Sequence, residues 1–362
     1  MTRNITSQRR LIEVDAARGV AVIMVVGAHA VLGLLESGAL PEDHGLVTAY
    51  EITHVPRVAA IAFIAGLFIP GSLARRGALR LIRERAVLFG WLYVVWWTIQ
   101  SAVGLATDPL RNTPTTLASL AIWTPPAQLY FLPALWVGTV LTVAVLVAPR
   151  HFARRSRHGH RAVVGWTAAG LALLAALAIV TWGWVPPVLG AQYLALSFFV
   201  AVGAVLGLPG ARHVLRLPTP AWAGLGLVTG AVAVWCGTIG IVGPTDRSSL
   251  PFDLRVVSLV ATCAGVLALC AGAVLLARIP RVGDLLAWIG RRTVVVFTAH
   301  IVVVAGTRIT LQALGVQPEA VFVAAWVLGV VVPLVLASVA PRIGLGWLFA
   351  PPRWATSRVV AN

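Results

Sequence analysis

Residues 16–36, AARGVAVIMVVGAHAVLGLLE, form an apolar run of the length that crosses a lipid bilayer as a helix. Membrane strands are only about ten residues long and alternate in polarity, so a run of this length predicts a helix. Further runs of the same character follow at 56–74, 86–104, 128–149, 162–183, 187–208, 219–242, 256–277, 293–312 and 318–340. The sequence therefore predicts an all-α polytopic integral membrane protein with about ten transmembrane helices. We expect a single transmembrane domain over residues 1–362, without an appended soluble domain.

The composition agrees with a membrane protein and argues against a nucleic-acid partner. Of the 362 residues, 59% are hydrophobic and 11% are charged, whereas soluble domains carry about 25% charged residues. All 28 basic residues are arginine, and an excess of basic residues in a membrane protein is explained by the positive-inside rule. The three cysteines, Cys236, Cys263 and Cys270, lie in apolar runs without metal-ligand spacing, so no metal site is predicted.

The arginines between the predicted spans alternate in a way that orients the chain. With ten spans, 22 of the 28 arginines lie on one side, including those that follow spans two, four, six and eight. The opposite loops hold acidic residues such as Glu36, Asp108, Asp246 and Glu319. The positive-inside rule therefore predicts a multi-pass membrane protein with both termini in the cytoplasm.

Two further segments have distinctive compositions. The loop 105–127 is longer than the others and is rich in proline, so it could form a lid or a re-entrant element, or be an ordinary solvated loop. Residues 281–290, RVGDLLAWIG, are predicted to form a short amphipathic helix at the cytoplasmic interface.

Ionisable side chains inside spans are costly, and the first span carries three of them. Arg18 and His29 are eleven residues apart, which is a rotation of only about 20° and a rise of about 16 Å along a helix. Asp15 lies one turn from Arg18 on nearly the same face. This stripe is predicted to face a bundle interior or a wet cavity. Alternatively, Arg18 snorkels to the interface and His29 only bonds a neighbouring helix.

A few more ionisable residues lie in or beside other spans. His54 begins the second span, His300 lies near the middle of the ninth, and Arg308 lies near its outer end. No carboxylate occupies the middle of any predicted span, although proton- or sodium-coupled transporters usually need one there. This pattern counts against secondary transport.

Five segments of the chain resemble the membrane acyltransferase-3 family of bacterial inner-membrane O-acyltransferases. In order, they are RLIEVDAARGVAVIMVVGAHA (10–30), HVPRVAAIAFIAGLF (54–68), Arg80-Leu-Ile-Arg83, LYFLPAL (129–135) and IGRRTVVVFTAH (289–300). Arg18 and His29 match the basic residue and histidine of the family's first span. Other positions depart from the pattern, and these bear on the acceptor pocket more than on the donor site: Arg57 where an apolar residue is usual, Ala65-Gly66-Leu67 for Ser-Gly-Phe, Tyr130 for Trp and Phe297 for Tyr.

The resemblance implies transfer of an acyl group, usually acetyl, from acyl-CoA to a hydroxyl of a sugar or related acceptor. Acyl-CoA is then a co-substrate on the cytoplasmic side, and no bound cofactor is expected. Arg18, Arg80 and Arg83 would bind its phosphates, with Asp15 orienting Arg18. His29 would act as general base.

The remaining roles follow from the same resemblance. His300 or Tyr130 would donate to the oxyanion, and His54 would contact the acceptor near the outer mouth. The acceptor stays open among envelope polysaccharide, glycolipid and glycosylated metabolite. Two other functions also stay open: a carrier or flippase for a polar or lipid-linked solute, and a membrane sensor or scaffold without turnover.

Overall fold

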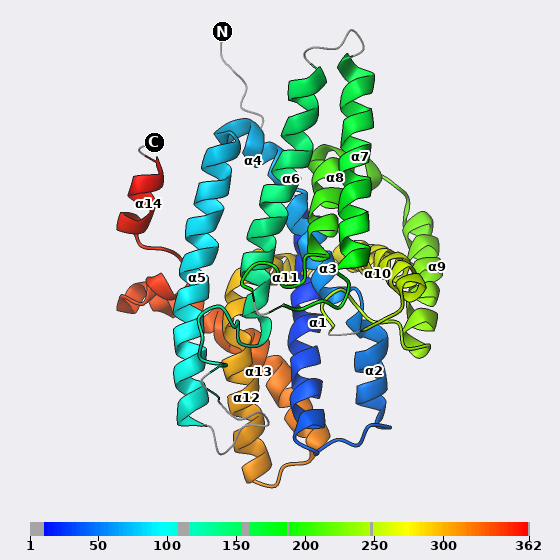
Figure 1. The fold of residues 1–362 in the computed structure, drawn as a ribbon. Coiled ribbons are helices and arrows are strands. Elements are labelled where there is room, and N and C mark those ends of the chain that lie inside the picture. Colours follow the sequence, from blue (N-terminus) through cyan, green and yellow to red (C-terminus); the bar gives the residue numbers. More distant parts are fainter. Residues whose placement is uncertain are drawn as a thin grey trace.

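The computed structural model describes residues 11–107, 116, 118–153, 159–186, 188–246 and 249–360, which fold into helices joined by turns (Figure 1). Within these residues, ten helical segments are long and apolar enough to cross a membrane. Their bounds are Ile12–Glu36, Gly45–Arg76, Ala78–Ala106, Ala127–Pro149, Arg161–Val180, Leu196–Val214, Thr219–Thr238, Phe252–Ala277, Thr293–Ala313 and Pro318–Ile343. The predicted all-helical polytopic membrane fold is confirmed. Several arginines that oriented the chain lie outside the described residues: Arg3, Arg9, Arg10, Arg154, Arg155 and Arg157.

Helix α1 (Ile12–Glu36) is the central element of the bundle. It packs against six helices, whose bounds are Gly45–His54 (α2), Arg57–Gly66 (α3), Phe252–Ala277 (α10), Val282–Gly290 (α11), Thr293–Ala313 (α12) and Pro318–Val339 (α13). Val22, Val26 and Ala30 of α1 are almost completely buried. Half of its most apolar stretch is buried inside the protein, as expected of a helix in a central position. The polar stripe of α1 consequently faces other helices of the protein.

The second span is not one continuous helix. It consists of α2 (Gly45–His54), α3 and α4 (Ile69–Arg76), with breaks at Val55–Pro56 and at Leu67–Phe68. Pro56 has no backbone N–H and cannot continue the hydrogen-bond ladder of α2, which explains the first break. Val55 itself keeps helical dihedral angles, with φ of −55° and ψ of −48°. The predicted span 56–74 coincides with α3 and α4, whereas α2 was not predicted.

The sixth span begins later than predicted. Helix α8 covers Leu196–Val214, whereas the prediction was 187–208. Residues 188–195 form turns, and Tyr193 has a φ of 57°. Apolar composition alone does not reveal these turns, which is why the predicted start was wrong. At its other end the helix continues across a break at Gly207, where φ is 58° and ψ is 176°.

The predicted short helix at 281–290 is confirmed as α11, and two glycines fix its position. A Cβ on Gly19 would lie 2.1 Å from the carbonyl oxygen of Leu286, and a Cβ on Gly290 would lie 1.8 Å from the carbonyl oxygen of Asp15. Only glycine allows α1 and α11 to approach this closely. The opposite side of α11 exposes Leu285 and Trp288, as expected of a helix at an interface.

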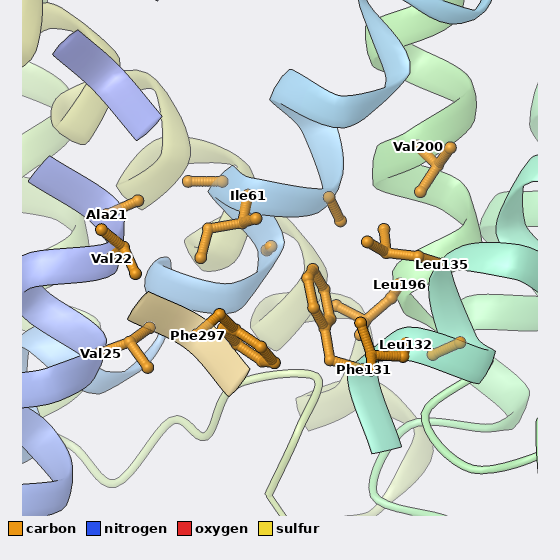
Figure 2. Packing of buried hydrophobic residues seen from close by; sticks show 14 of the residues in the cluster. Ala21, Val22, Val25, Ile61, Phe131, Leu132, Leu135, Leu196, Val200 and Phe297 are labelled. Atoms are coloured by element: carbon orange, nitrogen blue, oxygen red, sulfur yellow. The ribbon is translucent and has the colours of Figure 1, made fainter. Parts of the chain in front are cut away.

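The remaining helices surround this centre. They are α5 (Ala78–Ala106), α6 (Phe131–Ala153), α7 (Gly159–Val180), α9 (Thr219–Thr238) and the short α14 (Arg353–Val360). Figure 2 shows the apolar cluster in the middle of the bundle, where Val22 and Val25 of α1 lie near Ile61 of α3 and Phe297 of α12. Phe131 of α6 completes it, with its ring centroid 4.9 Å from that of Phe297. We call this cluster, made up of Val22, Val25, Ile61, Phe131 and Phe297, the apolar seal.

Candidate active site

A cavity of about 1000 Å³ lies at the end of the bundle where α1 begins. Five arginines line it, and they come from four separate parts of the chain: Arg18 of α1, Arg75 of α4, Arg212 of α8, and Arg291 and Arg292 between α11 and α12. Asp15 is the acidic residue of the lining. We call this space the arginine cavity. Its surplus of positive charge suits it to a multiply charged anion.

Asp15 holds two of these arginines in place. Its Oδ1 lies 3.8 Å from Nη1 of Arg18, and its Oδ2 lies 3.8 Å from Nη1 of Arg291. The guanidinium of Arg18 also stacks on the ring of Phe68, 4.2 Å from its centroid. Asp15 is only 8% exposed. A buried carboxylate thus sets the spacing of two guanidinium groups that come from different helices.

A second cavity, of about 590 Å³, lies toward the opposite end of α1, and we call it the histidine cavity. His29 and Glu36 of α1 line it together with Gln100 of α5 and Arg308 of α12. Residues 119, 120 and 124–127 of the long loop also contribute to its wall. The loop is anchored by Tyr93, whose hydroxyl donates to the carbonyl oxygen of Ile122 at 2.6 Å. The described part of the loop therefore borders a cavity, and its behaviour as a lid stays a prediction.

His29 and His300 meet beside the histidine cavity, with ring centroids 5.2 Å apart. Nδ1 of His300 lies 3.0 Å from the carbonyl oxygens of both Val296 and Phe297. Carbonyl oxygens only accept hydrogen bonds, so in neutral His300 the proton is on Nδ1 and Nε2 carries the lone pair. This Nε2 is buried and has no hydrogen-bond partner among the described residues. A buried, unpartnered nitrogen of this kind is available to accept a hydrogen bond or a proton.

Two buried glutamines support the backbone of α12 next to His300. Gln128 donates through Nε2 to the carbonyl oxygens of Phe297 at 3.1 Å and Thr298 at 3.3 Å. Gln100 donates to the same oxygen of Thr298 at 3.3 Å. These bonds fix the turn of helix that carries His300. No motif pointed to the glutamines, because an amide between apolar residues has no distinctive spacing.

A charged network begins at the break between α2 and α3. Nε2 of His54 is bonded to the carboxylate of Asp246, and the guanidinium of Arg57 is bonded to Nδ1 of His54. Arg57 is only 4% exposed and stacks over the ring of Tyr50, 4.9 Å from its centroid. Both His54 and Arg57 lie within electrostatic reach of His29. Arg57, which the sequence marked only as a departure from a pattern, is thus the buried member of a network with His54 and Asp246.

Tyr130 belongs to the same region. It ends the short 3-10 turn Ala127–Tyr130, and its ring centroid lies 4.1 Å from that of Tyr193. It interacts electrostatically with Arg57 and Asp246. The structure therefore gathers Tyr130, His29, His54 and His300 in one half of the bundle, and Asp15 and Arg18 at the other end of α1.

Comparison of the chain with protein-family profiles finds a match. The sequence profile of the acyltransferase-3 family, described as an acyltransferase domain, matches residues 11–340. The chain belongs to the acyltransferase-3 family. It is therefore a multi-pass membrane acyltransferase, which confirms the resemblance seen in the sequence. Comparison with curated proteins and with solved structures finds no match.

The two other arginines predicted to bind the donor of this acyltransferase do not line the arginine cavity. Nε of Arg80 lies 2.9 Å from Oε1 of Glu84, and the side chain of Arg83 is exposed. Four arginines without a predicted binding role line the cavity together with Arg18, namely Arg75, Arg212, Arg291 and Arg292. The charge pattern had placed these four on the same side as Arg18, but it could not indicate which of the many arginines on that side converge.

Proposed function

We propose that this membrane acyltransferase transfers an acyl group, in the first place acetyl, from acyl-CoA to a hydroxyl of a sugar, a glycolipid or a glycosylated metabolite. The observation that carries the proposal is that one helix, α1, lines both cavities. Arg18 lies in the arginine cavity, and His29 follows about 16 Å farther along the helix in the histidine cavity. A phosphate-binding group and a proton-accepting group are thus held in fixed relation by one rigid element.

The arginine cavity is the proposed site of the coenzyme A phosphates. Guanidinium groups bind phosphate oxygens in pairs and stay charged at all relevant pH values. Five such groups face one carboxylate, Asp15. Since coenzyme A is available in the cytoplasm, the proposal places this cavity on the cytoplasmic face of the plasma membrane. The excess of arginine on that side of the chain supports the same orientation.

The acyl group has to pass the apolar seal to reach His29. Val22, Val25 and Phe297 are each no more than 3% exposed, and the two valines lie between Arg18 and His29 in α1. The pantetheine arm of coenzyme A is long and mostly uncharged, so it suits a narrow apolar passage. We infer that donor binding rotates the side chains of the seal and admits the thioester.

In the proposed reaction, His29 is the general base. It accepts the proton of the acceptor hydroxyl while that oxygen attacks the carbonyl carbon of the thioester. The carbon–sulfur bond then breaks, and the thiolate of coenzyme A takes up the proton from His29. His300 presents a lone pair on Nε2, so we assign it the task of orienting His29 by accepting a hydrogen bond. Stabilisation of the oxyanion then falls to Tyr130, the other candidate donor.

The proposal is tested by thioester turnover in purified protein. In lipid nanodiscs supplied with acetyl-CoA and acceptor extracts, the wild-type protein should release free coenzyme A and the His29→Ala variant should not. Movement of a solute across a vesicle membrane without release of coenzyme A would instead support a carrier. Mass spectrometry of envelope glycans and small metabolites from deletion and wild-type cells would identify the acceptor.

The proposed orientation has its own test. Reporter domains fused after Arg161 should be active on the cytoplasmic side, and those fused near Asp246 on the external side. The reversed pattern would contradict the placement of the donor in the arginine cavity.

A further inference from the structure

Arg308 lines the histidine cavity, yet the proposed transfer chemistry does not use it. It belongs to the last two turns of α12 and is only 7% exposed. An arginine that merely reaches toward the membrane surface keeps its charged group in contact with water. Reaching toward the membrane surface therefore does not explain why Arg308 is buried. Ionisable groups kept inside a membrane protein commonly mark the path or the site of a ligand.

The position of Arg308 relative to His29 is fixed by close packing. A Cβ on Gly33 would lie 3.3 Å from both Cδ and Nε of Arg308, so the arginine side chain lies across Gly33. Gly33 is four residues after His29, which is about one helical turn, or about 6 Å, farther along α1. The guanidinium and the imidazole thus line one cavity about one helical turn apart.

The partners of Arg308 among the described residues are neutral. Its Nη1 donates to Oε1 of Gln312 at 2.8 Å, and Nε2 of Gln312 donates to Oγ of Ser37 at 3.0 Å. In the described part of the chain, no carboxylate oxygen lies within 4.0 Å of Arg308. Glu36 interacts with it electrostatically, but from an exposed position at the rim. The guanidinium is therefore hydrogen-bonded to a neutral amide and has no ion pair within this distance among the described residues, whereas a buried charge is normally paired.

We propose that Arg308 binds an anionic group on the acceptor, so that the acceptors of this enzyme carry a carboxylate or a phosphate near the hydroxyl that is acylated. This inference rests on the proposed function, because it takes the histidine cavity as the acceptor site. The hydroxyl lies at His29 and the anion at Arg308, about one helical turn away. Gln312 fixes the guanidinium in the orientation that receives the anion. Glu36, a negative charge at the rim, opposes entry of the anion and moderates its affinity.

The test measures binding and does not depend on turnover. Dissociation constants of the purified protein are measured for three probes: methyl glucuronide, glucose 6-phosphate and the neutral methyl glucoside. We expect the wild-type protein to bind one or both anionic probes at least about tenfold more tightly than the neutral one. The stronger of the two anionic probes identifies the anion as carboxylate or phosphate.

Variants of the two charged residues give opposite expectations. Arg308→Gln should abolish the preference for the anionic probe and leave the affinity for methyl glucoside within about twofold. Arg308→Lys should keep part of the preference, and Glu36→Gln should increase it. Equal affinity of the wild-type protein for all three probes would overturn the proposal, as would an unchanged preference in Arg308→Gln. If Arg308→Gln does not fold, the wild-type preference and the response to Glu36→Gln decide the question.

The experiments distinguish failure of the inference about Arg308 from failure of the proposed function. If the protein binds anionic probes through Arg308 but releases no coenzyme A, the anion site is supported and the proposed acyl transfer is contradicted. If the protein releases coenzyme A but binds all three probes equally, the acyl transfer is supported and the anion site is contradicted.

Discussion

Replacement of Gly290 by alanine would test whether the position of α11 sets the affinity for the donor. A Cβ at this position would lie 1.8 Å from the carbonyl oxygen of Asp15, whereas ordinary contacts begin at 3.4 Å, so α11 would have to move from α1 by about 1.6 Å. Arg291 follows Gly290 directly, and its guanidinium lies at 3.8 Å from Asp15. A shift of this size takes Arg291 out of ion-pair range and changes its spacing from Arg18.

The expected result is a loss of donor affinity. One charge-assisted bond to phosphate contributes about 1.5–3 kcal/mol, so its loss should raise the KM for acetyl-CoA about tenfold or more. The assay is the initial rate of coenzyme A release at varied acetyl-CoA concentrations, in nanodiscs.

Gly272→Ala is the matched control for this prediction, because a Cβ there meets nothing within 4 Å. Gly19→Ala disturbs the same helix contact from α1, where the Cβ would lie 2.1 Å from the carbonyl oxygen of Leu286, and it should reproduce the defect. If Gly290→Ala and Gly19→Ala both fold normally and keep a KM within twofold of the control, the position of α11 does not govern donor binding and the reasoning is refuted.

Further variants address the proposed base and the phosphate site. His29→Ala should lower turnover by about 10²–10⁴ with little change in the KM for acetyl-CoA. His29→Gln should be nearly as inactive, because an amide cannot take the proton; near-normal turnover in a folded His29→Gln protein would transfer the role to His300. Arg18→Ala should raise the KM for acyl-CoA about tenfold, and Arg18→Lys should restore only part of the affinity. A short thioester without the nucleotide should be insensitive to Arg18, and equal losses with both donors would contradict phosphate binding. The double change Arg80→Ala with Arg83→Ala lies outside the cavity and should leave the KM nearly unchanged, whereas a large increase would show that the donor contacts a wider surface.

The sequence predicted the features of this fold that are local. In the described part of the chain, each of the ten spans contains one apolar run whose length alone separates helix from strand. All ten were therefore anticipated, except for the α2 part of the second span. The spacing of Arg18 and His29 on α1 was predictable for the same reason, because both residues share one helix. Errors arose where the backbone changes direction inside an apolar stretch, as at the start of α8 and at the breaks around α3.

Long-range relations could not be predicted in this way. His54 and Asp246 are 192 residues apart, and nothing in the chain indicates that they are bonded. The convergence of Arg18, Arg212 and Arg291 depends on the rotation of each helix about its axis, which a charge count does not contain. The pairing of His29 with His300 was not predicted. The sequence places each of them inside a span, but it does not show that the two helices are neighbours.

The division of the second span into α2, α3 and α4 has a mechanical consequence. Helix α3 is a rod of ten residues, about 15 Å long, with a break at each end. Its first residue, Arg57, interacts electrostatically with His29, and the break at its far end leads to Phe68, which stacks on Arg18. Because α3 packs closely against α8, where a Cβ on Gly66 would lie 2.1 Å from the carbonyl oxygen of Val200, its two ends cannot move independently. One short, stiff segment therefore joins the wall of the arginine cavity to the charged network at Arg57.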